Sequence, residues 1–171
     1  FNTHRMVREY FEKFYLQAYE KRKELQKDKW KKAVELAEWK ELVRQKWSQV
    51  SLKRILDGKN AKSIFVGEEF PVEAEIDLGE LTPDDVEVQL YFGPVEKQDN
   101  PEFNSTVVMS PVNSKYKNGV ITYRGNIVTN HSGQQGYTIR IVPKHPMLAN
   151  PFEIGIVYWA DTVSYTHLRA H

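Results

Sequence analysis

The chain has 171 residues, with 24 Lys and Arg against 23 Asp and Glu, 5 His and no cysteine. A composition of 40% hydrophobic and 27% charged residues favours a packed core over disorder, and the length fits one domain, or one domain with an appended helical piece. Without cysteine, the sequence excludes disulfides, thiolate zinc sites, iron–sulfur clusters and thiol catalysis.

Charged and turn-forming residues divide the chain near residue 56. Residues 1–56 hold 15 Lys and Arg and 8 Asp and Glu, a net charge of +7, whereas the remainder holds 9 and 15, a net charge of −6. All 9 glycines and all 8 prolines lie at or beyond Gly58. Helix interiors exclude both residue types and turns between strands need them, so the sequence predicts a helical first third and a β-rich remainder.

The apolar runs are short and the first residues lack the pattern of a signal peptide, so we expect no membrane span and a cytoplasmic protein. The first residue is Phe1 rather than Met, which favours a fragment of a longer protein.

Two helices, or one long kinked helix, are predicted over residues 3–26 and 28–48. In the first, apolar residues recur with a spacing of four, which draws a wide stripe along one face: Met6/Val7, Tyr10/Phe11, Phe14/Tyr15 and Ala18. In the second, we place the stripe at Trp30, Ala33/Val34, Ala37, Leu42/Val43 and Trp47. Two helices cannot bury such stripes against each other alone, so the stripes must face the following domain, another chain or a missing part of this one. We expect both helices to dock poorly in this chain by itself.

Alternating apolar and polar residues after Val50 predict eight strands. The clearest case runs from Phe70 to Leu78, where every second residue is apolar and the intervening positions are mostly acidic. Residues 81–85 predict one capped helical turn, with Thr82 as the cap. The predicted strands are residues 51–56, 63–66, 70–77, 86–92, 106–109, 120–128, 136–142 and 153–159.

This pattern predicts an α+β fold class, in which an N-terminal helical segment precedes an immunoglobulin-like antiparallel β-sandwich. Tyr137 follows Gly133 and Gly136, and we place it at the start of the penultimate strand, as in a tyrosine corner. The domain prediction is helices over residues 1–49, the sandwich over residues 50–160, and a foreign tail over residues 161–171.

Motifs for catalysis are missing from the sequence, which contains no Walker loop, dinucleotide glycine fingerprint, His-Glu-x-x-His or Gly-x-Ser-x-Gly. Loop or surface positions explain three scattered histidines better than ligand roles do: His4, His131 and His145. A solvated strand face explains the alternating carboxylates Glu73, Glu75, Asp77 and Glu87 better than acid–base chemistry does. We therefore predict no catalytic, cofactor-binding or metal-binding residue in this chain.

Two binding functions are weighed against plain structural roles. A basic run comprises Lys21, Arg22, Lys23, Lys27, Lys29, Lys31 and Lys32, but acidic residues interrupt it, as in an exposed helix with ion pairs three or four residues apart. We expect no nucleic-acid partner. A sugar-stacking platform could use Trp30, Trp39, Trp47, Tyr91, Tyr123, Tyr158 and Trp159, although packing inside or between domains explains Trp47 and Trp159 better.

Several segments resemble, in order, the carboxyl end of bacterial and archaeal α-glucan (glycogen/maltodextrin) phosphorylases. The opening residues 1–10 resemble the last helical segment of the catalytic region, and Trp39-Lys40 with Trp47-Ser48-Gln49-Val50 resembles the following linker. Further stretches resemble the C-terminal β domain: residues 66–68, 77–86, 90–93, 132–146, 150–151 and 155–160.

The resemblance implies a parent enzyme that uses inorganic phosphate to release glucose 1-phosphate from α-1,4-glucan, with pyridoxal phosphate as cofactor. It places the cofactor lysine and the phosphate-binding residues in the catalytic lobes that precede residue 1, so it implies no cofactor in this fragment and no catalytic residue. The partners it implies are those missing lobes of the same polypeptide and, through them, α-glucan. Two alternatives are a free-standing glucan-binding β-sandwich module and a structural or interaction domain.

Residues 161–171 differ in sequence pattern from the preceding chain and resemble translated sequencing-linker text, so they are set aside as foreign.

Overall fold

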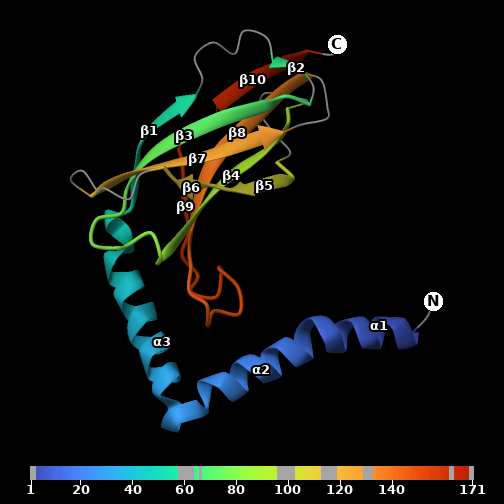
Figure 1. The fold of residues 1–171 in the computed structure, drawn as a ribbon, viewed down its shortest axis with the longest axis vertical. Helices are drawn as coiled ribbons and strands as arrows, with labels where there is room; N and C mark the ends of the chain where they lie inside the picture. The colour runs from blue at the N-terminus through green and yellow to red at the C-terminus, as the bar shows by residue number, and fades with distance from the viewer. Residues whose placement is uncertain are drawn as a thin grey trace.

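The computed structural model describes residues 3–57, 64–65, 67–95, 103–112, 119–128, 133–161 and 164–169. Within these ranges the chain forms helices followed by two β-sheets, which confirms the predicted α+β class (Figure 1). The predicted strand residues 63 and 66 lie outside the described residues, as does His131.

The helical part consists of two helical rods that meet at a sharp bend (Figure 1). The first rod comprises α1 (Thr3–Tyr10), a π-helical turn η1 (Phe11–Tyr15) and α2 (Leu16–Leu25). The second is α3 (Lys27–Lys46), which ends in a 3₁₀ turn, η2 (Trp47–Gln49). The predicted break near residue 27 is therefore confirmed.

Left-handed backbone conformations mark the bend between the rods. Asp28 has φ = 53° and Trp30 has φ = 67°, and non-glycine residues rarely adopt such angles. Gln26, just before them, donates its backbone N–H to the carbonyl of Arg22 at 3.0 Å, which closes the last turn of α2.

The β part contains a four-stranded sheet and a larger mixed sheet. In the first, the strand order is β1-β3-β7-β6 and all pairs are antiparallel. Its strands are β1 (Ser51–Asp57), β3 (Glu69–Asp77), β6 (Ser110–Pro111) and β7 (Val120–Val128).

The larger sheet has the order β2-β10-β8-β4-β5, with β9 also paired to β8. Its pairs are antiparallel except for β10 and β2, which are parallel. Its strands are β2 (Ile64–Phe65), β4 (Val86–Pro94), β5 (Ser105–Val108), β8 (Gly133–Pro143), β9 (Tyr158–Trp159) and β10 (Ser164–Arg169).

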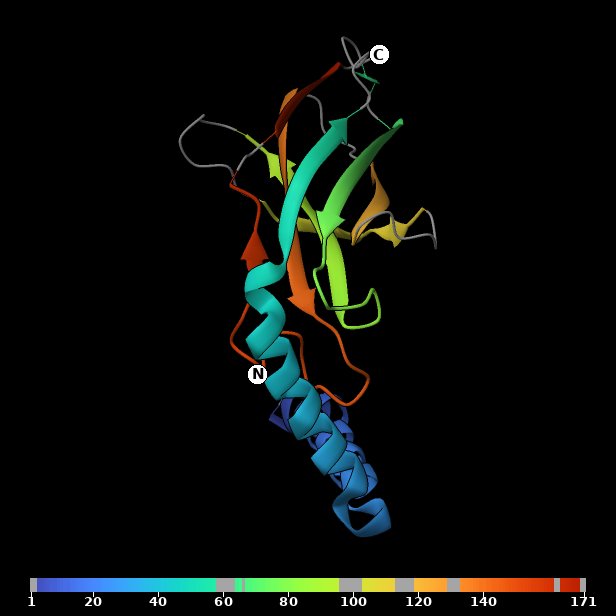
Figure 2. The same cartoon turned by 90° about the vertical axis from the view of Figure 1, so that its left-hand side faces the viewer.

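The core lies between the two sheets, whose strands face each other in Figures 1 and 2. In β3 the alternation is as predicted, because Phe70, Val72, Ala74 and Ile76 are buried. Gly125 of β7 permits a close approach of the two sheets, since a Cβ atom there would lie 2.8 Å from Leu90 Cδ1 of β4.

Three local predictions are wrong. Residues 153–159 form turns and only a two-residue strand, since Gly155 has φ = +77° and interrupts the extended backbone. Residues 81–85 form a hydrogen-bonded turn rather than a helical turn, with the Asp85 N–H donating to the Thr82 carbonyl at 3.0 Å. Tyr137 is the fifth residue of β8 rather than its first, and its ring packs edge-on against Phe70 in the core; the tyrosine corner stays a prediction.

The segment set aside as foreign also contains a strand. Residues 164–168 of β10 pair with residues 133–137 of β8, and β9 pairs with Arg140 and Ile141 on the same edge. The two strands therefore follow one another along β8. The foreign origin of residues 161–171 stays a prediction.

Candidate functional site

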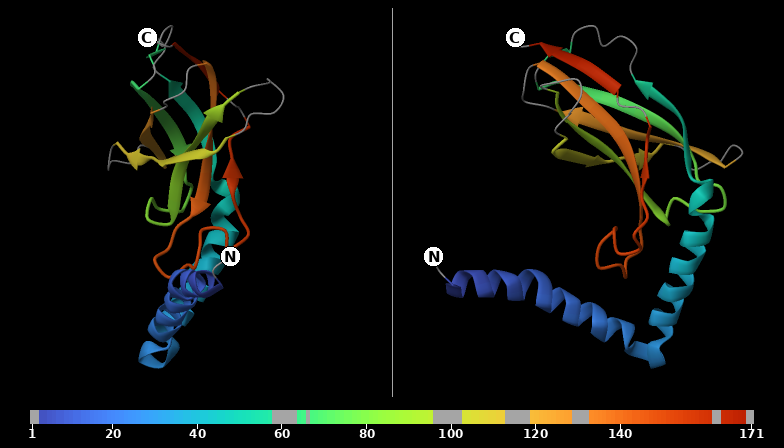
Figure 3. Two further views of the ribbon diagram at one scale, coloured as in Figure 1. Left: turned by 90° about the vertical axis from the view of Figure 1, so that its right-hand side faces the viewer. Right: turned by 180° about the vertical axis from the view of Figure 1, so that it is seen from behind.

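The two helical rods meet the sheets in different ways, and this difference defines the candidate site. The rod α3 packs against the lower end of the β part, whereas the rod of α1, η1 and α2 diverges from α3 at the bend and runs sideways below the β part (Figures 1 and 3). We call the segment from Thr3 to Leu25 the helical arm, and the contact between α3 and the sheets the junction.

The junction buries one face of α3. Val43 is fully buried in the main core, and Trp39 and Trp47 pack against the same core. Leu36 is buried in a second apolar cluster with Leu148 and Ile154. The prediction that both helices dock poorly is therefore wrong for α3, because its buried positions repeat every three or four residues and face the end of the two sheets.

A hydrogen-bonded group at the junction joins three elements. The Trp39 indole Nε1–H donates to Asp85 Oδ1 at 2.7 Å, and the Trp39 ring lies 4.6 Å, between centroids, from the ring of His145. Asp85 also accepts from the Thr82 N–H at 2.8 Å and the Thr82 hydroxyl at 2.7 Å. His145 thus lies in a loop, as predicted, but is half-buried at the junction, while His4 is exposed as predicted.

Burial and hydrogen bonding act in opposite directions on these two titratable groups. Burial opposes ionisation of Asp85, but hydrogen bonds from Thr82 and Trp39 outweigh it and hold the pKa of the carboxyl below its ordinary value. Burial lowers the pKa of His145, the nearby Lys40 adds to this, and Asp85 opposes it. The junction therefore favours an ionised Asp85 beside a neutral His145.

Ion pairs surround the apolar junction. Lys40 of α3 pairs with Glu153 in the loop after β8, and Lys46 pairs with Glu80 at 2.7 Å. Gln49 Oε1 accepts from the Glu80 N–H at 2.9 Å. Lys21 of α2 donates to the carbonyl of Leu148, and Leu25 packs on the second apolar cluster, so the base of the arm is also fixed.

Away from this base, the helical arm buries none of the side chains that the structure describes. Every residue from His4 to Leu16 is exposed. Eight large apolar side chains on the arm are between 43% and 67% exposed: Met6, Val7, Tyr10, Phe11, Phe14, Tyr15, Leu16 and Tyr19. We call this set the arm stripe, and for it the prediction of poor docking is confirmed.

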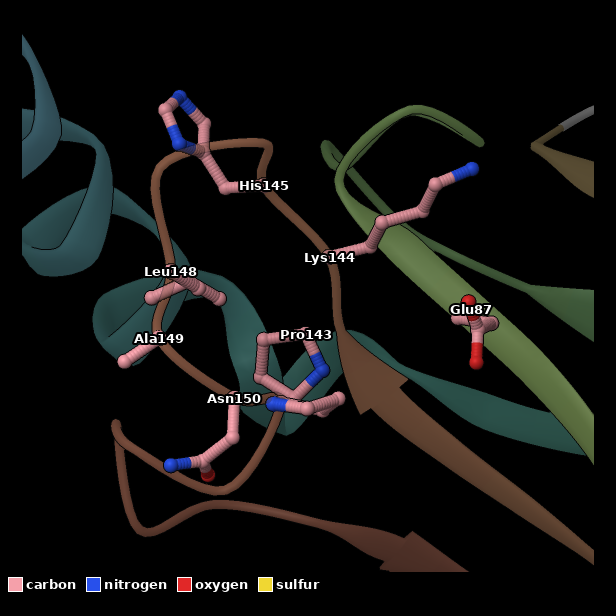
Figure 4. A pocket seen from close by; sticks show the side chains of 8 residues that line it. Glu87, Pro143, Lys144, His145, Leu148, Ala149 and Asn150 are labelled. Atoms are coloured by element: carbon pink, nitrogen blue, oxygen red, sulfur yellow. The ribbon is translucent and has the colours of Figure 1, made fainter. Parts of the chain in front are cut away.

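A cavity of about 210 Å³ lies at the end of β8 beside the following loop (Figure 4). Lys144 and His145 both border it, but their side chains point in different directions. The other residues that line it are Glu87, Pro143, Leu148, Ala149, Asn150 and Pro151. Among the described residues no group of three or more His, Cys, Asp or Glu could hold a metal ion. The absence of a catalytic residue stays a prediction.

The carboxylates that alternate along the strands have basic or polar partners. Arg124 pairs with Glu73, Arg54 with Glu75 at 2.7 Å, and Lys53 with Asp77 at 3.1 Å. Glu87 accepts from Gln89 at 2.6 Å. These contacts agree with a paired strand face.

The basic run is likewise interleaved with acidic partners. Lys32 pairs with Glu24 across the bend, and Lys31 pairs with Glu35 at 3.8 Å.

Among the described helices, none is long and apolar enough to cross a membrane.

Most of the aromatic residues considered for sugar stacking lie in separate places, but the ring centroids of Tyr91 and Trp159 are 5.6 Å apart. Trp39 and Trp47 pack at the junction, Tyr123 is buried in β7, and Trp30 is exposed at the bend. The Tyr158 hydroxyl accepts from the Leu52 N–H at 3.1 Å. The candidates therefore do not form one platform.

Tyr91 and Trp159, two of the sugar-stacking candidates, join Phe152 around Arg140 of β8, and sequence reasoning missed the roles of Arg140 and Phe152. The Arg140 guanidinium carbon lies 4.9 Å from the ring centroid of Tyr91, 5.2 Å from that of Trp159 and 5.3 Å from that of Phe152. Arg140 Nε also donates to Gln89 Oε1 at 2.8 Å. The group holds the loop after β8 against the sheet. No spacing in the sequence signals it, because its members come from three separate segments.

Comparison with known proteins adds a family and several relatives. Residues 47–161 match the family model described as the glycogen phosphorylase C-terminal domain. A maltodextrin phosphorylase of Thermococcus litoralis is 30% identical over 163 residues, which is 93% of this chain and 18% of the relative. Glycogen phosphorylases of Mycobacterium bovis and Mycobacterium tuberculosis are 28% identical over 159 residues, which is 90% of this chain and 18% of each relative. The match lies at the C-terminal end of these relatives, so the chain corresponds to their C-terminal portion.

Proposed function

The chain belongs to the family of the glycogen phosphorylase C-terminal domain, and from this premise we propose that it serves as the accessory portion of an α-glucan phosphorylase. The parent enzyme would transfer glucose units from α-1,4-glucan to inorganic phosphate, giving glucose 1-phosphate. Its pyridoxal phosphate and its catalytic residues would lie in the part of the polypeptide that precedes residue 1.

One observation carries the proposal: relatives named as phosphorylases match over 93% and 90% of this chain, yet the match covers only 18% of their length. Nearly all of this chain therefore aligns with one end of a larger enzyme. A free-standing module, the alternative considered above, would not need the helical arm, whose apolar stripe has no partner among the described residues.

The chemistry of the described residues agrees with an accessory role. Bound phosphate and the phosphate of pyridoxal phosphate need several basic side chains or backbone N–H groups directed at one point. Here most basic groups near the sheets pair with carboxylates, as Lys40, Lys46, Lys53, Arg54 and Arg124 do. We propose that the chain binds no pyridoxal phosphate and catalyses no phosphorolysis by itself.

We also propose the finer architecture. The β part is an immunoglobulin-like sandwich over residues 50–160, which the helices of residues 1–49 connect to the catalytic lobes. Two facing sheets with a continuous apolar core support the sandwich, and the change from η2 to β1 at Val50 supports the boundary. The family match ends at residue 161, which supports a foreign tail beyond it, although β10 pairs with β8 there. The proposed location is the cytoplasm.

The test compares the chain with the complete polypeptide encoded by its reading frame, extended upstream of Phe1. Each protein is incubated with maltodextrin and inorganic phosphate, and glucose 1-phosphate and the absorbance of bound pyridoxal phosphate are measured. The complete polypeptide should give both signals and the chain neither. Release of glucose 1-phosphate by the chain, or an upstream frame without a phosphorylase, would overturn the proposal.

A further inference from the structure

The helical arm combines a large apolar surface with a firm attachment to the rest of the chain. Its base is held by the contacts of Lys21 and Leu25 with the loop after β8 and by the pair between Lys32 and Glu24 across the bend. Beyond this base, the residues from His4 to Leu16 have no buried side chain. A fixed helix that exposes this many aromatic and aliphatic side chains in water is typical of an interaction surface.

The π-helical turn η1 gathers the arm stripe onto one side. In an unbroken α-helix, Tyr19 would lie about 120° around the axis from Val7. A π-helical bond spans one residue more than an α-helical bond, so the single turn at Phe11–Tyr15 moves the following helix back by about 100° and brings Tyr19 to within about 20° of Val7. The same shift reduces the angle between Leu16 and Val7 around the helix axis from about 180° to about 80°. The turn thus joins the stripe of α1 to that of α2.

The opposite side of the arm is charged. Arg5 pairs with Glu9 at 3.3 Å, and Arg8 pairs with Glu12 at 2.9 Å. The helical period places Arg5 and Glu9 about 180° from the centre of the apolar side. The arm is therefore amphipathic although it covers nothing in this chain, and only its apolar side needs a partner.

The position of the arm identifies the partner. The sheets do not cover the stripe, since its side chains are exposed; the arm diverges from α3 at the bend and runs sideways below the β part (Figures 1 and 3). The match covers 18% of the relatives and lies at their C-terminal end, so most of a parent polypeptide would precede residue 1. The arm is the part of the chain that continues directly from that missing length.

We infer that the arm stripe is the docking surface for the preceding part of the same polypeptide, and that the junction holds the sandwich away from this contact. The inference rests on the proposed function and adds to it the contacting surface. The arm would supply Tyr10, Phe11, Tyr15 and Tyr19 to the interface, and the β part would take no part in it.

Hydrogen exchange read by mass spectrometry tests the inference on the chain and on the complete polypeptide. Peptides covering residues 4–19 should exchange quickly in the chain and at least tenfold more slowly in the complete polypeptide, whereas peptides of β3 should exchange alike in both. The variant Tyr10→Ser/Tyr15→Ser should lose the added protection. The matched control Arg5→Ser/Glu9→Ser, on the charged side, should keep it.

The outcomes separate this inference from the proposed function. If the complete polypeptide releases glucose 1-phosphate but residues 4–19 exchange as quickly as in the chain, the docking inference falls and the proposed function stands. If the chain alone forms a stable dimer that protects residues 4–19, the partner is a second copy and the inference is wrong. If the upstream frame encodes no phosphorylase, the proposed function itself fails.

Discussion

Asp85 and His145 make the junction sensitive to acid in a defined direction. The lowered pKa of His145 means that the unfolded chain takes up a proton at about pH 6.5 while the folded chain does so only at a lower pH. The unfolded state then binds more protons, so stability falls as the pH drops below about 6.5. The pKa values of Asp85 and Glu153 are also lowered, and these two groups reduce the stability only in more acidic solution, below about pH 4.5.

We therefore expect the urea midpoint of the chain to decrease between pH 7.5 and pH 5.5. The variant His145→Gln should show a smaller decrease over the same interval, since it removes the group that titrates there. Equilibrium unfolding followed by tryptophan fluorescence measures both midpoints. An equal decrease in the variant would place the pH dependence at another residue.

Gly79 is required where the helices meet the sheets. Its φ of +59° is unfavourable for other residues, and a Cβ atom would lie 2.5 Å from Gln49 Cβ and displace the side chain that bonds the Glu80 N–H. Gly79→Ala should therefore lower the free energy of unfolding by about 2 kcal/mol. Gly155→Ala is the control, because Gly155 has φ = +77° with nothing within 4 Å and incurs only the backbone strain. Thermal unfolding that gave equal losses would contradict a packing role for Gly79.

At the scale of elements, α3 shows how much of the fold its sequence predicts. Alternation predicts β3 and β7 closely, because one face of each strand is buried and the other wet. The buried face of α3 is harder to predict, since this helix has apolar residues on more than one side. The predicted Trp30, Val34 and Leu42 are exposed, while Leu36 and Trp39, which the prediction omitted, pack at the junction. A strict alternation of three and four from Ala33 through Leu36, Lys40, Val43 and Trp47 to Val50 would have found this face.

The remaining errors come from contacts that a local pattern does not contain. The strand β10 pairs with residues about thirty positions earlier, and the group around Arg140 joins β4, β8 and the loop that follows. The π-helical turn follows from no propensity in residues 11–15. Such features depend on which segments the fold brings together, whereas the absence of a catalytic motif could be read from the sequence directly.

The burial of α3 predicts a large difference between two valines of the same helix. Val43 is fully buried and Val34 is 54% exposed. Val43→Ala should lower the free energy of unfolding by about 1–3 kcal/mol, because it removes buried methyl groups and leaves a small cavity. Val34→Ala should change it by less than about 0.5 kcal/mol. Chemical denaturation of both variants provides the measurement, and equal losses would mean that α3 does not dock as the structure shows.

For the whole molecule, the division into arm, junction and β part predicts the stability of shortened chains. A chain of about 110 residues can bury roughly two-thirds of its surface, so residues 50–160 should fold alone with a cooperative thermal transition. Residues 27–160 should melt at a higher temperature, because α3 adds Leu36, Val43 and the hydrogen bond between Trp39 and Asp85. Adding residues 1–26 as well should raise the melting temperature much less, since beyond Lys21 and Leu25 the described residues of the arm bury almost nothing against the β part. Calorimetry on residues 50–160, 27–160 and 1–160 measures the three melting temperatures. A large gain from residues 1–26 would show that the arm stripe finds its partner within this chain, and the absence of a transition in residues 50–160 would show that the β part depends on α3 to fold.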